Sequence, residues 1–208
     1  MAKRGDQLRE HILWVAKDVF LEVGFERASM DVVASRAETS KRSLYAHFES
    51  KEKLFLAVID LVRGLFLDKL KHPGDYAPKP ADALVMFCAR YLEVMLFQHS
   101  VQMCRVAMAE AARFPEGAAR YFDVLFTEVQ RRLTAYLRDT FELSPKAGAQ
   151  AAQSLLGRIL YPRLPRAFFG IDPLAERFDD EALAPGFDLK PIRRAVAELI
   201  ETVAKAKR

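Results

Sequence analysis

The chain has 208 residues, of which 51% are hydrophobic and 29% are charged, so it can form one large or two small globular domains with a real core. No apolar run is long enough to cross a bilayer and the N-terminal stretch does not have the pattern of a secretory signal, so we expect a cytoplasmic protein with no membrane partner. The net charge of +4, from 32 basic and 28 acidic residues, does not by itself imply a nucleic-acid partner, and two cysteines are too few for a disulfide framework.

The first predicted helix has an apolar stripe with a spacing of three and four residues. The stripe consists of Leu8, Ile12, Val15, Val19 and Val23. Gly24 is a natural residue for the end of this helix. Lys3, Arg4 and Arg9 lie at its start, and they form either a solvated tail or an arm that lies on DNA.

The stretch from Ser29 to Lys53 predicts two short helices and the start of a third. Ser29 is a candidate N-cap, because the apolar residues that follow it have helical spacing. After a short break, Ser40 opens the second helix, which has Leu44 and Phe48 four residues apart on its inner face. Ser50 is the next candidate cap. The pattern is that of a tight helix pair followed by a long helix.

The outer face of the second short helix carries cations, hydroxyls and an amphipathic ring. These side chains are Lys41, Arg42, Ser43, Tyr45 and His47. A face that is merely solvated usually mixes acids with its bases, and this helix has no acid between Ser40 and Phe48. Such a face fits the major groove of DNA.

Residues 12–55 resemble the DNA-binding domain of the TetR family of transcriptional regulators. The resemblance is strongest over residues 40–45, 47–48, 50–52 and 54–55. It implies an all-α protein with an N-terminal helix-turn-helix domain of three helices, residues 1–50. A long helix would join this domain to a larger helical ligand-binding and dimerisation domain, residues 51–208.

Two residues depart from the family pattern at the turn between the short helices. Glu38 stands where the family usually has Gly, and Thr39 stands where it usually has Val. A residue other than Gly at a turn that requires positive φ is uncommon and carries some strain. An acid close to DNA also repels phosphate, so the departures bear on the turn geometry and leave the fold unaffected.

The resemblance further implies which side chains face a double-stranded DNA operator. They are Ser29, Ser40, Lys41, Arg42, Ser43, Tyr45, His47 and Lys51. We expect Ser29, Tyr45, His47 and Lys51 to bind phosphates, which fixes the register without reading the sequence. We expect Lys41 and Arg42 to read bases, and Ser43 to contact either a base or a phosphate.

The helix that starts near Ser50 keeps its apolar period to Leu70, so it would transmit movement from the rest of the chain to the DNA-binding domain. Residues 72–80 contain three prolines and a glycine and cannot continue a helix. Residues 81–114 return to a helical pattern, broken near His99, that is apolar on most sides and therefore buried.

The apolar centre of the chain is rich in Met and aromatic residues, which fill irregular core space or line adaptable pockets. Residues 105–116 resemble the AefR-like class of C-terminal domains within the same family. Both readings, a plain core and an effector pocket, stay open for any single residue. The candidate ligand-binding residues are Phe87, Tyr91, Met95, Met103, Arg105, Met108, Tyr121, Phe122, Phe126 and Leu156.

Four further segments complete the chain. A helix begins at Pro115, another spans residues 147–170 with Pro162 and Pro165 kinking or ending it, and a long acidic loop follows. An amphipathic helix closes the chain. The last two helices predict a homodimer interface, or else they only close the core of a single copy. The candidate interface residues are Leu155, Ile159, Ile192, Val196, Leu199 and Val203.

The remaining polar residues form no recognisable catalytic or metal-binding pattern. The four histidines lack ligand spacing, and there is no phosphate loop, nucleophile elbow or triad, so we expect no metal, no cofactor and no enzymatic activity. Cys88 and Cys104 lie in apolar helices, where thiols are usually inert, although a redox-sensing role is the alternative.

The sequence therefore predicts a homodimeric repressor that a small apolar or amphipathic effector releases from a pseudo-palindromic operator. The first alternative is a DNA-binding regulator without an effector, whose apolar centre is core throughout. The second alternative is a helical enzyme, which lacks any group of residues to perform a reaction.

Overall fold

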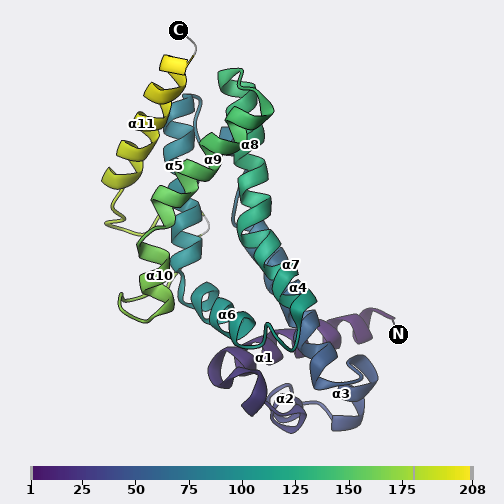
Figure 1. Ribbon diagram of the computed structural model, residues 1–208. Helices are drawn as coiled ribbons and strands as arrows, with labels where there is room; N and C mark the ends of the chain where they lie inside the picture. The colour runs from purple at the N-terminus through teal and green to yellow at the C-terminus, as the bar shows by residue number, and fades with distance from the viewer. Residues whose placement is uncertain (1, 180, 207–208) are drawn as a thin grey trace. The chain divides into compact units, whose positions relative to one another are not determined.

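The computed structural model describes residues 2–179 and 181–206, and over these residues the fold is all-α, as predicted (Figure 1). No β-strand occurs in this part of the chain, where an isolated parallel bridge joins Phe97 to Ala175. The elements are α1 (Ala2–Arg27), α2 (Met30–Arg36), α3 (Lys41–His47), α4 (Lys51–Asp68), η1 (Pro73–Asp75), α5 (Pro80–Leu96), α6 (Gln98–Ala109), α7 (Pro115–Phe122), the π-helical η2 (Asp123–Thr127), α8 (Glu128–Phe141), α9 (Pro145–Leu160), α10 (Arg163–Phe168) and α11 (Lys190–Ala206).

Several helix ends differ slightly from the prediction. Gly24 has φ of 75° and breaks α1 as expected, but helical turns resume as far as Arg27. The predicted break near His99 lies at Phe97, whose extended ψ of 137° ends α5. The predicted helix over residues 147–170 is two helices, α9 and α10, because Pro162 lacks the N–H that would continue the first.

The chain forms two compact units, each built from two segments. The first unit comprises Met1–Leu65 and Gln102–Tyr121, and the second comprises Phe66–Val101 and Phe122–Arg208. These units are a different division from the domains expected at residues 1–50 and 51–208, and that expectation stays a prediction about function. The first unit holds the helix-turn-helix together with the end of α6 and most of α7.

The core of the first unit centres on four aromatic rings. Phe20 and Phe55 meet edge to face with their centroids 5.2 Å apart, and Phe25 lies 5.1 Å from Phe55. Phe114, from the segment between α6 and α7, completes the group at 4.9 Å from Phe25. Because aromatic pairs stabilise a core beyond the area they bury, this cluster holds α1, α4 and the distant residue 114 together.

The second unit is built around α5, which packs beside α9 and α11 (Figure 1). Residues 83–85 and 87–95 of α5 are all buried, as expected for a helix that is apolar on every side. Two of the buried residues are charged, Arg90 and Glu93. An ion pair between them, with 2.7 Å between Nη1 and Oε2, compensates for the loss of water around each charge.

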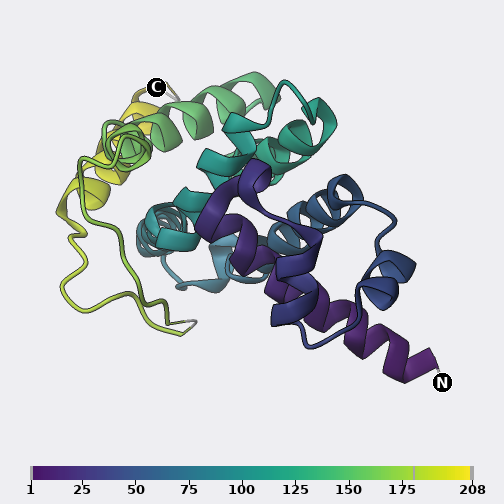
Figure 2. The same ribbon diagram turned by 90° about the horizontal axis from the view of Figure 1, so that it is seen from below.

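The loop between α10 and α11, residues 169–189, is attached to this ion pair (Figure 2). Arg90 donates a second hydrogen bond of 2.7 Å to the carbonyl of Asp179, and the backbone N–H of Ala184 donates to Glu93 at 2.6 Å. The Phe178 ring lies 4.8 Å from the Arg90 guanidinium. The described part of this long loop is thus bound to α5 through two buried charges.

Removal of one charge tests this arrangement. We expect Arg90→Met to lower the free energy of unfolding by about 3–5 kcal/mol, because it leaves the Glu93 carboxylate buried without its partner. The double variant Arg90→Met/Glu93→Leu should recover most of this loss. Denaturant unfolding measures both values. The matched control is Arg131→Met, which breaks the exposed Arg131–Glu128 pair and should change stability by less than about 1 kcal/mol. Equal effects of the two single variants would contradict a structural role for the buried pair.

Candidate DNA-binding site

The two short helices are capped and packed as the sequence predicts. The N–H of Val32 donates to Ser29 Oγ at 3.2 Å, and the N–H of Ser43 donates to Ser40 Oγ at 3.1 Å. Each serine therefore begins its helix as an N-cap. Leu44 and Phe48 are buried on the inner face of α3, so the orientation of its outer face is fixed.

The turn between α2 and α3 has the positive φ that the family pattern led us to expect. Glu38 has φ of 48°, the N–H of Thr39 donates to Ala34 O at 3.0 Å, and the N–H of Glu38 donates to Ser35 O. This is the Schellman arrangement, in which Gly is the usual residue at the left-handed position. The helix pair keeps its geometry, but Glu38 holds a strained backbone conformation.

The outer face of α3 presents the predicted side chains. Lys41, Arg42 and Tyr45 are exposed, while Ser43 and His47 are half-buried. No acid lies on α3 itself. The face therefore offers donors and cations along one side of a short rod, which suits contact with the edges of bases and with phosphates.

One of the predicted base readers has an acidic neighbour on α2. Lys41 Nζ lies 2.7 Å from Asp31 Oδ1, and this hydrogen bond raises the pKa of Lys41 above its usual value. Both side chains are exposed, so the pair is weak in water. DNA would have to compete with Asp31 for Lys41, whereas Arg42 has no such pair among the described ion pairs.

Lys51 has a different environment from the one we predicted. Its Nζ donates to three carbonyls at the end of α1, those of Phe25 (2.9 Å), Glu26 (3.3 Å) and Ala28 (3.0 Å), and it lies 4.3 Å from the Phe25 ring centroid. An ammonium has three hydrogens, so these acceptors use them all. In this structure the Lys51 ammonium therefore caps the end of α1, and its expected contact with a phosphate remains a prediction.

The basic residues Lys3, Arg4 and Arg9 lie within the bounds of α1. The side chains of Lys3 and Arg4 lie outside the described residues. The Arg9 guanidinium lies 5.1 Å from the centroid of the Phe48 ring, at the end of α3. Arg9 therefore contacts the end of α3 through a cation–π interaction, which the sequence pattern did not indicate.

The candidate ligand-binding residues fall into both compact units. In the second unit, Phe87, Tyr91 and Met95 are fully buried on α5 and Leu156 is buried on α9, while Phe122 is exposed and Phe126 is half-buried. Tyr91 Oη donates to the carbonyl of Leu125 at 2.9 Å. The rings of Phe122 and Phe126 lie 4.9 Å apart beside the π-helical segment η2, an irregularity often found at functional sites.

The candidates in the first unit lie on α6 and α7. Met103 and Tyr121 are buried, Arg105 is half-buried and Met108 is exposed.

Burial raises the pKa of the Cys104 thiol to about 12, and burial moves the pKa of Cys88 further in the same direction. Both thiols are thus uncharged near neutral pH, which does not favour the redox-sensing alternative, because the thiolate is the reactive form.

The candidate interface residues are mostly buried within the single chain. Leu155, Ile159, Ile192, Val196 and Val203 are buried and Leu199 is half-buried. Leu155, Leu199 and Val203 line a groove of about 310 Å³ between α9 and α11. These side chains therefore serve the packing of one copy, and their contact with a second copy remains a prediction.

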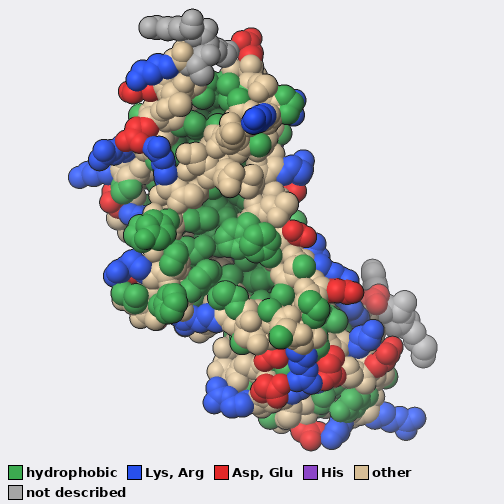
Figure 3. All heavy atoms as spheres, in the orientation of Figure 1, with side chains coloured by type: hydrophobic (Ala, Val, Ile, Leu, Met, Phe, Trp, Pro, Cys, Tyr) green, Lys and Arg blue, Asp and Glu red, His purple; other side chains and the backbone are tan. Residues whose placement is uncertain are grey.

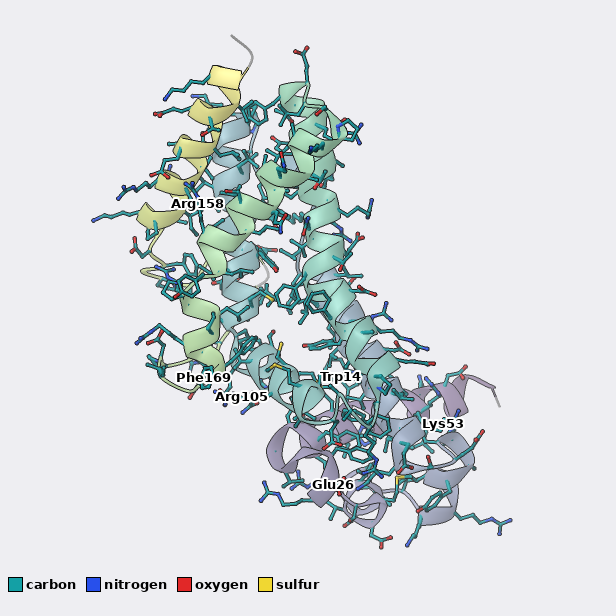
Figure 4. The ribbon with its side chains drawn as sticks, viewed as in Figure 1. Trp14, Glu26, Lys53, Arg105, Arg158 and Phe169 are labelled. Atoms are coloured by element: carbon teal, nitrogen blue, oxygen red, sulfur yellow. The ribbon has the colours of Figure 1, made fainter. Side chains whose placement is uncertain are left out.

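Sequence reasoning missed the exposed apolar residues around α10. Tyr161 is 73% exposed, Phe169 is 84% exposed and Ile171 is 58% exposed. Figure 3 shows hydrophobic side chains gathered over α10 and the adjoining part of α9, and Figure 4 labels Phe169 at the end of α10. A contiguous group of large exposed apolar side chains is a candidate interaction surface.

The described residues also bear on two other features, a metal site and a membrane-spanning helix. No group of three or more His, Cys, Asp or Glu residues there could hold a metal ion. Among the same residues no helix has both the length and the apolar character needed to cross a bilayer.

A capped helix pair whose second member presents an acid-free cationic face defines a helix-turn-helix DNA-binding regulator. Residues 12–58 match the family of bacterial regulatory proteins described as the tetR family, and residues 82–184 match the C-terminal domain of AefR-like transcriptional repressors. The chain belongs to the TetR family of transcriptional regulators, which bind DNA operators and function as dimers.

The curated relatives agree over part of the chain. The transcriptional activator FasR of Mycolicibacterium smegmatis is 46% identical over 54 residues, which are 26% of this chain and 25% of FasR. The transcriptional repressor NicS of Pseudomonas putida is 34% identical over 65 residues, which are 31% of each chain. The chain thus spans about a quarter to a third of the length of these relatives.

Solved structures of other regulators are similar to this chain over nearly its whole length. The flavonoid-responsive regulator FrrA has a TM-score of 0.70 and 26% identity, with 97% of each chain covered. A TetR transcriptional regulator from Agrobacterium tumefaciens has a TM-score of 0.71 and 20% identity, with 94% of each chain covered, which shows a shared fold.

The strained turn generates a prediction with a matched control. We expect Glu38→Gly to raise the free energy of unfolding by about 0.5–1 kcal/mol, because the strain of a left-handed residue exceeds the entropy that Gly loses on folding. The same substitution should tighten DNA binding by removing an acid near phosphate. Glu142 has φ of 52° at the end of α8, so Glu142→Gly should stabilise the protein without changing DNA affinity. Thermal unfolding and a DNA-binding titration check both. If neither variant were more stable, the left-handed residues would not be strained.

Proposed function

We propose that this TetR-family chain is a homodimeric repressor that binds a pseudo-palindromic operator and that a small apolar or amphipathic effector releases. The observation that carries the proposal is the outer face of α3, where Lys41, Arg42 and Tyr45 are exposed and no acid is present. A cytoplasmic location fits a protein whose partner is chromosomal DNA.

The proposed contacts with DNA divide into two roles. Arg42 is the main base reader, because a guanidinium forms two hydrogen bonds to guanine and Arg42 has no acid beside it in the described ion pairs. Lys41 reads a base after it leaves Asp31. The hydroxyls of Ser29, Ser40 and Tyr45, with His47, bind phosphates, while Ser43 contacts either a base or a phosphate.

The proposed dimer uses the surface formed by α9, α10 and α11. The groove between α9 and α11 and the exposed side chains of Tyr161, Phe169 and Ile171 support this choice, because apolar surface of this kind is usually covered by a partner. Two recognition helices related by a two-fold axis would require half-sites about one helical turn, roughly 34–36 Å, apart.

The proposed response to a ligand follows from linkage. An effector that binds better to a conformation with mismatched recognition helices lowers operator affinity by its difference in affinity for the two states. The buried aromatic and Met side chains Phe87, Tyr91 and Met95 support an apolar site. The structurally similar regulator FrrA is named as flavonoid-responsive. This name supports a planar aromatic effector for the present chain.

Two alternatives keep a specific basis. The apolar centre is also consistent with plain core, in which case the protein regulates DNA without an effector. The relatives also include an activator, FasR, as well as a repressor, NicS, so the direction of regulation is part of the proposal.

The role of Arg42 is tested on fragments that the protein selects from its source genome. We expect Arg42→Ala to weaken binding by about 1–3 kcal/mol and to relax the preference at one base position of each half-site. Lys146→Ala, which removes an exposed charge from α9, should leave binding unchanged. Footprinting should show two symmetric half-sites. A uniform loss of affinity on every sequence would make Arg42 a contact to the DNA backbone.

The effector is tested with planar aromatic and amphipathic compounds, flavonoids among them. A true effector at a hundred times its Kd should stabilise the protein by about 2.7 kcal/mol in thermal unfolding. The effector should also lower the affinity of the protein for the operator. The operator should lower the affinity of the protein for the effector by the same factor, because coupling between sites is reciprocal. Compounds that stabilise the protein but leave operator affinity unchanged would favour the effector-independent alternative.

A further inference from the structure

In the helix-turn-helix, the end of α1 meets the start of α4. We call this junction, residues 25–28 and 51–52, the base of the helix-turn-helix. Lys51, at the start of α4, reaches back to the carbonyls of Phe25, Glu26 and Ala28 at the end of α1. Residues 29–50, which contain both short helices, lie between these two points. The base therefore joins the two ends of the segment that carries α3.

A second cation reaches the same base from a distant part of the sequence. Arg113 lies between α6 and α7, and its guanidinium forms ion pairs with Glu26, before α2, and with Glu52, after α3. It also lies 4.7 Å from the centroid of the Phe25 ring. One side chain thus connects both ends of the helix-turn-helix, and Figure 4 labels Glu26 on the last turn of α1.

The segment that carries Arg113 is itself well anchored in the first unit. The N–H groups of Arg113 and Phe114 both donate to the carbonyl of Glu110, at 3.0 and 2.8 Å, which makes residues 110–114 a tight corner. The Phe114 ring packs against Phe25 and Phe55, with centroids 4.9 and 5.3 Å away. The guanidinium and the ring therefore reach the base together.

The start of α7 leaves the corner in close contact with α4. A Cβ placed on Gly117 would lie 2.8 Å from Leu56 Cδ2 and 3.1 Å from Ile59 Cδ1, so a side chain at residue 117 would require the ends of these two side chains to move. A shift of α7 would consequently displace both α4 and residues 110–114.

We infer that residues 110–114 act as a clasp on the helix-turn-helix, and that Arg113 is a positioning residue for operator binding. By holding Glu26 and Glu52 at a fixed separation, the clasp sets the orientation in which α3 meets DNA. In this role Arg113 acts through Glu26 and Glu52 and needs no contact of its own with DNA. The DNA-binding part of this inference rests on the proposed function, whereas its effect on the base of the free protein does not.

Two measurements on Arg113→Gln test the clasp. In the free protein, amide hydrogen exchange should become faster over residues 25–30 and 40–48. On a duplex fragment that the wild-type protein selects from its source genome, affinity should fall by about threefold to tenfold, because α3 would adopt the binding orientation for a smaller fraction of the time. The slope of log affinity against log salt should stay unchanged, since no phosphate contact is removed.

Matched variants separate this role from general effects of charge. Arg120→Gln removes an arginine of α7 that pairs with Asp60 and Glu116 but does not reach the base, and it should leave exchange and affinity as they are. The exchanged pair Glu26→Arg/Arg113→Glu should restore part of the affinity that Arg113→Glu alone loses, because it repairs the pair with residue 26 but not the pair with Glu52. If Arg113→Gln were poorly folded, Glu26→Gln would remove the same ion pair from the other side.

The possible outcomes are distinct. Unchanged exchange in Arg113→Gln and Glu26→Gln would overturn the inference and make these contacts surface ion pairs without effect. A salt slope lower by about one would show instead that Arg113 binds a phosphate. If the wild-type protein selected no fragment, the proposed function would fail, and the exchange measurements would still decide whether the clasp exists.

Discussion

The structure of the DNA-binding part depends on how the carboxyl end of α1 is satisfied. The last carbonyls of a helix have no partner within it, and here the Lys51 ammonium donates to two of them, those of Phe25 and Glu26, and to the carbonyl of Ala28 just beyond the helix. Since Lys51 is the first residue of α4, this contact ties the end of the first helix to the start of the fourth. The contact thereby closes the segment that holds the two short helices, while the burial of Leu44 and Phe48 orients the exposed face of α3.

The parts of the site that the sequence predicted are those in which the signal and its cause lie close together in the chain. Ser29 and Ser40 cap the helices that begin immediately after them, and Leu44 and Phe48 are buried because they share one face of a short helix. Glu38 was expected to be strained because the family pattern places Gly there, and its positive φ confirms this. The burial of α5 followed from periodicity in the same way, and the all-α fold was implied by the resemblance to the TetR family.

The contacts that could not be predicted join residues far apart in the sequence. A basic residue at the start of a helix suggests a phosphate ligand, and nothing near Lys51 in the sequence shows that three carbonyls lie within its reach. Arg113 and Glu26 are likewise separated by 87 positions.

Apolar spacing also left the inner face of α1 uncertain: Val15 was placed on the stripe and is half-buried, whereas its neighbour Ala16 is fully buried. Patterns of residue type specify a face only to within about one residue.

The attachment of the α10–α11 loop to Arg90 and Glu93 has a consequence for how this chain can diverge. A descendant that shortened the loop would lose the Asp179 carbonyl and the Ala184 N–H, and two charges in the middle of α5 would then lack part of their solvation. A descendant that replaced either charge first would release the loop. Loop length and the two charged positions are therefore expected to change together among relatives, so that chains with a short loop carry apolar residues at both positions of α5.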